Sequence, residues 1–166
     1  GNALRLKLDN SSINEVKSPT FVGRRLQHFD FQATTALSPE KSGKGEEAGL
    51  TVYMDYHSHY DVVIKKNAAG KHIIQLRYHL GKLNHIEKEV PLPGKSAHLR
   101  VSGNKTEFTF SYSTDGKTFT NLGTIDTKYL STETAGGFTG VILGMFGQAK
   151  QHGSYADFKY FEYSHK

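Results

Sequence analysis

The chain has 166 residues, enough for one domain with a sizeable core, and its lack of cysteine excludes disulfides, thiolate metal sites and cysteine nucleophiles. Its formal charge is +5, but the basic residues are dispersed, so we expect a solvated surface and no nucleic-acid partner. No apolar run reaches membrane-spanning length, so we expect no membrane partner either.

The first third of the chain reads as strands. Leucines alternate with charged residues over residues 3–8, a period of two that predicts a half-buried strand. A long strand-like stretch is predicted from Phe21 to Thr35. Its centre holds Arg24 and Arg25, for which we expect one partnered and one solvated side chain.

The remaining two thirds continue this pattern, with turns at Asn67–Gly70 and Asp115–Gly116 and no helical periodicity. Further strands are predicted at 48–54, 60–65, 72–79, 85–90, 97–101, 108–112, 119–125, from 141 onward, and at 155–163. About a dozen short strands are more than one open sheet usually carries. We therefore predict an all-β sandwich of two packed antiparallel sheets, forming a single domain over residues 1–166.

The clearest group of possible metal ligands is His57 and His59, with Asp55 and Asp61 beside them. Alternate residues of a strand share a face, so two imidazoles could reach one ion. The sequence does not place a third ligand beside them, however, and the segment is predicted to form the tip of a hairpin. A solvated turn is therefore the favoured interpretation.

Carboxylates elsewhere give no sign of catalysis. Glu46 and Glu47 are adjacent, so in a strand they would point to opposite faces and are poorly placed to flank one glycosidic bond; a surface loop is expected. No Ser-His-Asp spacing, phosphate loop or nucleotide fingerprint appears. The residues alone do not indicate an enzyme.

Asp157 lies among aromatic residues at the start of the last predicted strand. A carboxylate buried there must be paired, hydrogen-bonded or bound to a cation, and calcium accepts such oxygen ligands. The residues leave these alternatives open.

The segment Ala135–Gly140 presents one aromatic, Phe138, on a turn of small residues, and its glycines allow backbone angles that are costly for other residues. From residue chemistry alone, a tight connection with Phe138 buried in the core is the favoured interpretation.

Five segments, taken together and in order, resemble the C-terminal domain of family-43 glycoside hydrolases of the β-xylosidase or α-arabinofuranosidase type. They are Phe21–Phe29, Glu46–Val52, Phe110–Phe119, Ala135–Gly140 and Ala156–Phe158. The resemblance implies a concanavalin-like jelly-roll β-sandwich that packs on a five-bladed β-propeller carrying the catalytic carboxylates.

The resemblance also implies site residues. Phe138 would close one wall of a substrate pocket for a xylo- or arabino-oligosaccharide, and Asp157 would ligate a structural calcium ion. The chain begins Gly1-Asn2 without Met, so we expect an excised C-terminal domain whose propeller is missing. We expect an accessory domain that is not catalytic by itself. The alternative is a free-standing carbohydrate-binding module, which the absence of Trp weakens.

Overall fold

The computed structural model describes residues 4–8, 13, 20–40, 46–130, 140–149 and 154–165. These residues form twelve strands and one short 3₁₀ turn, η1. The elements are β1 Leu4–Lys7, β2 Thr20–Arg25, β3 Phe31–Glu40, β4 Glu47–Asp55, β5 Ser58–Lys66, β6 His72–Leu80, β7 Leu83–Pro91, β8 Ala97–Gly103, β9 Glu107–Ser113, β10 Thr120–Asp126, η1 Thr127–Tyr129, β11 Ile142–Gln148 and β12 Tyr155–His165.

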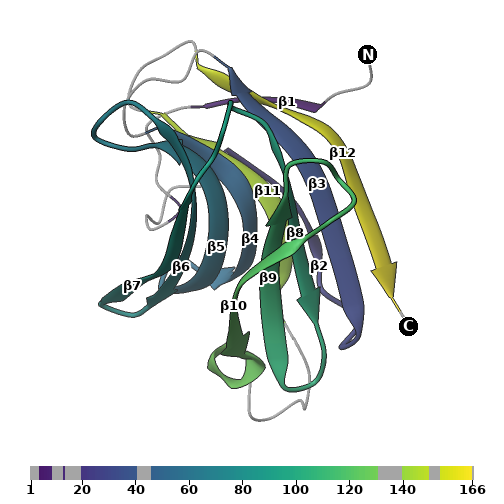
Figure 1. Cartoon of the computed structure of the whole chain (residues 1–166). Coiled ribbons are helices and arrows are strands. Elements are labelled where there is room, and N and C mark those ends of the chain that lie inside the picture. Colours follow the sequence, from purple (N-terminus) through teal and green to yellow (C-terminus); the bar gives the residue numbers. More distant parts are fainter. Residues whose placement is uncertain are drawn as a thin grey trace.

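The strands form two sheets of six, and every neighbouring pair is antiparallel (Figure 1). The first sheet has the order β1-β12-β3-β8-β9-β10, and the second has the order β2-β11-β4-β5-β6-β7. The prediction of an all-β sandwich of two packed antiparallel sheets is confirmed.

Alternation along the strands builds the core between the sheets. In β4, Ala48, Leu50 and Val52 are buried, and in β9, Phe108 and Phe110 are buried against them from the other sheet. Fully burying a side chain of Leu, Val or Phe size stabilises a fold by about 1.5–3 kcal/mol. The same alternation sends the intervening residues to the outer faces, where the polar side chains discussed below lie.

The predicted strand from Phe21 to Thr35 is wrong in its extent. The structure divides it into β2 and β3, which belong to different sheets. The chain changes sheets over residues 26–30, where Leu26 N–H donates to the carbonyl of Val141. The arginine expectation agrees with the structure: the Arg24 guanidinium lies 4.0 Å from the Tyr163 ring centroid, and Arg25 is exposed.

In the part of the chain that the structure describes, no helix is long and apolar enough to cross a membrane.

Candidate functional site

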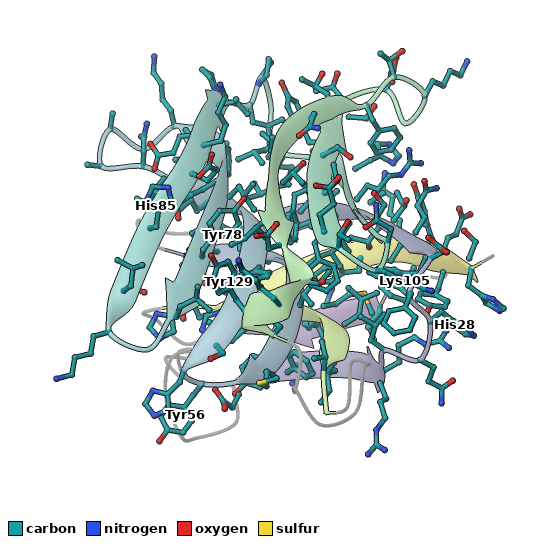
Figure 2. All side chains as sticks on the ribbon, turned by 90° about the horizontal axis from the view of Figure 1, so that it is seen from below. His28, Tyr56, Tyr78, His85, Lys105 and Tyr129 are labelled. Atoms are coloured by element: carbon teal, nitrogen blue, oxygen red, sulfur yellow. The ribbon has the colours of Figure 1, made fainter. Side chains whose placement is uncertain are left out.

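One end of the sandwich gathers the residues that flank the segment containing Phe138. We call it the turn end, defined by the β4–β5 turn, the β8–β9 turn, Leu130 and Gly140. It lies at the bottom of Figure 1, and Figure 2 looks onto it. Leu130 follows η1, and Thr127 of η1 donates its N–H to Thr106 in the β8–β9 turn. Gly140 lies two residues before β11, whose first residue, Ile142, pairs with Tyr53 near the end of β4.

Phe138 itself falls in residues 131–139, outside the described residues, so both interpretations of its position stay predictions. Its flanks are informative. Leu130 is fully buried, and Gly140 has a φ of 82°, a backbone conformation that favours glycine. The expectation that Gly140 adopts an angle costly for other residues is confirmed.

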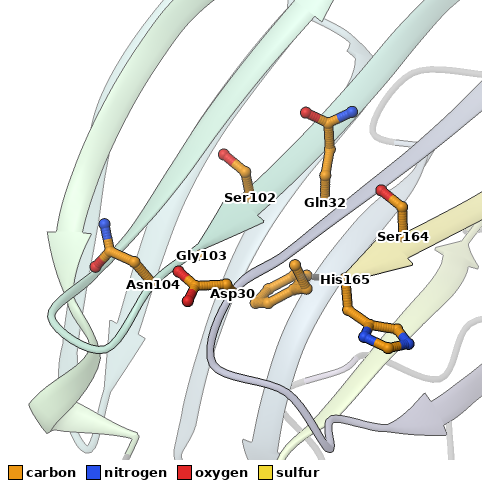
Figure 3. A pocket seen from close by; sticks show the side chains of 8 residues that line it. Asp30, Gln32, Ser102, Gly103, Asn104, Ser164 and His165 are labelled. Atoms are coloured by element: carbon orange, nitrogen blue, oxygen red, sulfur yellow. The ribbon is translucent and has the colours of Figure 1, made fainter.

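A polar pocket also opens at the turn end, where β3 begins and β8 and β12 end (Figure 3). Its volume is about 350 Å³. It is lined by Asp30, Phe31, Gln32, Ser102, Gly103, Asn104, Ser164 and His165. No sequence pattern marks this pocket. Its residues come from three distant segments, and only the strand pairing brings them together.

A charged network lies on the outer face of the second sheet; it consists of Glu47, Thr51, His59, Asp61 and Arg77. The Arg77 guanidinium lies 2.5 and 2.6 Å from the two Glu47 oxygens and 2.9 Å from Asp61 Oδ2. Asp61 Oδ1 also accepts from Thr51 at 2.7 Å and lies 2.8 Å from His59 Nδ1. Three adjacent strands are thereby joined through side chains.

Electrostatics explain why these charges are tolerated. Burial opposes ionisation of Asp61, but Arg77 and the hydrogen bond with His59 outweigh it and lower its pKa. Burial would likewise lower the pKa of Arg77, but the Glu47 charge, followed by that of Asp61, raises it above its usual value. The network is therefore a paired structural cluster, and its Asp61 carboxylate is held ionised rather than poised to donate a proton.

Two expectations are corrected here. The surface loop expected for Glu46 and Glu47 is wrong, since they are 3% and 2% exposed. Glu46 accepts from Ser154 at 2.6 Å, and Glu47 pairs with Arg77.

The prediction of a solvated turn is right for His57, which is exposed, and wrong for His59, which is fully buried. Arg77 supplies the positive charge that permits the burial of Glu47 and Asp61, and its pairing could not be predicted before the strand order was known. An arginine inside the alternating stretch 72–79 was the available signal.

Asp157 has a partner within the chain. Both its carboxylate oxygens accept from Arg5, at 2.7 and 2.9 Å, and these hydrogen bonds lower its pKa although partial burial opposes them. The sequence left pairing, hydrogen bonding and cation binding open for Asp157, and in the structure it forms an ion pair with Arg5. Within the described ranges, no three His, Cys, Asp or Glu side chains are grouped so as to hold a metal ion. The residues around Asp157 therefore do not fit calcium while Arg5 occupies both oxygens.

Comparison with known proteins finds the same fold in solved structures and relates the chain to one protein family. The family described as the beta xylosidase C-terminal concanavalin A-like domain matches residues 1–164. A non-reducing end α-L-arabinofuranosidase of Bacteroides ovatus, BoGH43B, is 32% identical over 165 residues. A putative β-xylosidase of Escherichia coli is 33% identical over 164 residues.

These matches cover 97% and 93% of this chain but only 31% of each relative. A solved structure, the B. ovatus xyloglucan-locus GH43B, superimposes with a TM-score of 0.86 at 30% identity, covering 99% of this chain and 33% of that one. The chain thus spans about one third of the relatives that it matches. From end to end, it belongs to the family of β-xylosidase C-terminal concanavalin A-like domains.

Proposed function

We propose that this chain serves a longer xylan-degrading glycoside hydrolase as its accessory β-sandwich, packing on a catalytic β-propeller and contributing Phe138 to the substrate pocket. One observation carries the proposal. The match spans the whole chain yet occupies about a third of enzymes named as an arabinofuranosidase and a β-xylosidase. The remaining two thirds leave room for a catalytic domain.

The chemistry of the described residues supports an accessory role. Hydrolysis of a glycosidic bond usually needs two carboxyl groups flanking the bond. The turn-end pocket is lined by one, Asp30, and the carboxylates of the charged network are bound by Arg77. The attachment of residues 131–139 between Leu130 and Gly140, both at the turn end, is consistent with a role for Phe138 there.

Replacing Phe138 with Ala in the sandwich joined to its propeller tests the pocket role. A ring forming one pocket wall contributes buried area and stacking, so we expect kcat/KM on xylobiose or an aryl xyloside to fall at least about fivefold. Steady-state kinetics measure this. The matched control is Phe119→Ala, since Phe119 precedes β10 at the far end of the sandwich and stacks with Arg100. Unchanged efficiency in Phe138→Ala would remove the pocket role.

Calcium binding at Asp157, which the resemblance implies, has a separate test. Calcium would have to displace the Arg5 guanidinium, so we expect the melting temperature to be the same with added calcium and with a chelator. A calcium-dependent rise that is lost in Asp157→Asn would instead support the metal site.

A further inference from the structure

The turn-end pocket has the size and the chemistry of a ligand site. Its volume of about 350 Å³ lies within the range of small-molecule pockets, roughly 300–1,000 Å³. Three of its side chains stand in one row across neighbouring strands, because Ser164 of β12 pairs with Gln32 of β3 and Gln32 pairs with Ser102 of β8. Figure 3 shows all three pointing to the same side.

This row faces outward and offers hydrogen bonds. Phe31 and Ala33 are buried in the core, so Gln32 between them projects to the outer face. Among the described residues, no hydrogen bond engages the side chains of Gln32, Ser102 or Ser164. A ligand could therefore use two hydroxyls and one amide without breaking bonds that hold the fold.

The second wall carries an acceptor and a donor. The Asp30 carboxylate also has no side-chain partner in the described part of the chain. The Asn104 side-chain oxygen accepts from the backbone N–H groups of Thr106 and Glu107, at 2.8 and 3.0 Å, which fixes the amide. Its NH₂ group is left as a donor held in place by the turn.

His165 ends the same strand as Ser164 but lies on the opposite face from the row, because it pairs with buried Phe31, and Figure 3 shows it pointing away from Ser164. The His165 ring stacks on the His28 ring with centroids 3.6 Å apart and planes 2° apart, and Tyr163 OH lies 2.9 Å from His28 Nδ1. Gly103 lets the Phe31 ring pack against its strand, since a Cβ there would lie 2.4 Å from that ring. The ligand-facing side therefore presents hydroxyl, amide and carboxylate groups, which suit a ligand with several hydroxyls.

The lining argues against other ligand classes. No Lys or Arg lines the pocket, and the Asp30 carboxylate would repel an anion. A metal ion would find a single carboxylate, and an apolar molecule would leave the polar groups unpaired. We infer that the pocket binds one unit of a neutral saccharide. The side chains that would bind it are Asp30, Gln32, Ser102, Asn104 and Ser164. The inference rests on described residues alone and does not depend on the role proposed for Phe138.

The test is a titration of the ¹⁵N-labelled chain with xylotriose, followed by amide chemical shifts, with arabinotriose as a second probe. We expect shift changes clustered at residues 30–32, 102–104 and 164–165. In Asp30→Asn the affinity should fall about tenfold, since hydrogen bonds to a charged group are worth about 1.5–3 kcal/mol. Gln32→Ala should also weaken binding.

Matched controls separate binding from folding. Asp126→Asn and Gln27→Ala change exposed residues of the same types outside the pocket lining, and both should bind as the parent chain does. All four variants should keep the parent melting temperature. Absence of shift changes with both sugars, shift changes confined to other surfaces, or unchanged affinity in Asp30→Asn would each overturn the assignment.

Discussion

At the scale of single residues, the turn between β9 and β10 shows how one carboxylate organises a backbone. Asp115 accepts from the N–H groups of Thr118 and Lys117, at 2.9 and 2.8 Å, and from Ser113 Oγ at 2.8 Å. These bonds favour the charged form and lower its pKa from 3.8 to about 2. The sequence predicted a hairpin at Asp115–Gly116, and the φ of 77° at Gly116 agrees.

This shift predicts a pH-dependent contribution to stability. A carboxylate whose pKa is lowered by folding stabilises the fold above its unfolded pKa, and loses that effect as pH falls through the folded value. Asp115→Asn should therefore unfold more readily than the parent at neutral pH. The difference should shrink from about pH 3.8 to about pH 2.

Urea unfolding at a series of pH values measures the Asp115 effect. Asp30→Asn is the control, because the Asp30 side chain has no hydrogen-bond partner among the described residues. A gap between parent and Asp115→Asn that stays constant down to pH 2 would contradict the explanation.

At the scale of elements, alternation predicted most strands to within two or three residues but did not reveal which strands share a sheet. β2 and β3 both follow a strand pattern, and nothing local marks the change of sheet at residues 26–30. The buried charges were missed for a related reason. Glu47 and Arg77 are thirty residues apart, and their pairing depends on β4, β5 and β6 lying side by side.

The charged network yields a prediction about these strands. Arg77→Ala would leave the buried carboxylates of Glu47 and Asp61 without their cation, so we expect a loss of about 3–5 kcal/mol in the free energy of unfolding. Arg77→Lys should lose less, because it keeps the charge but not the forked geometry.

Denaturant unfolding measures these losses. The matched control, Arg25→Ala, removes an exposed arginine and should change stability by no more than about 0.5 kcal/mol. Similar losses in Arg77→Ala and Arg25→Ala would show that the network does not stabilise the sheet.

At the scale of the whole molecule, the two-layer architecture could be predicted, because alternation marks most strands locally and about a dozen strands need two sheets. The turn-end pocket could not. Its walls come from residues 30–32, 102–104 and 164–165, and they meet only because β3 lies between β8 and β12. The motifs predicted Phe138 and Asp157 as site residues, whereas the described structure shows a pocket lined by Asp30, Gln32 and Asn104 among others.

The division of the sandwich into two ends has a practical consequence for handling the protein. The β5–β6 turn at Asn67–Gly70 lies at the end opposite the pocket, and Ala68 in it is exposed. Because the chain has no cysteine, Ala68→Cys would introduce its only thiol. Coupling through that thiol would immobilise every molecule in one orientation on a sensor surface, with the pocket and the Leu130–Gly140 flanks facing the solution.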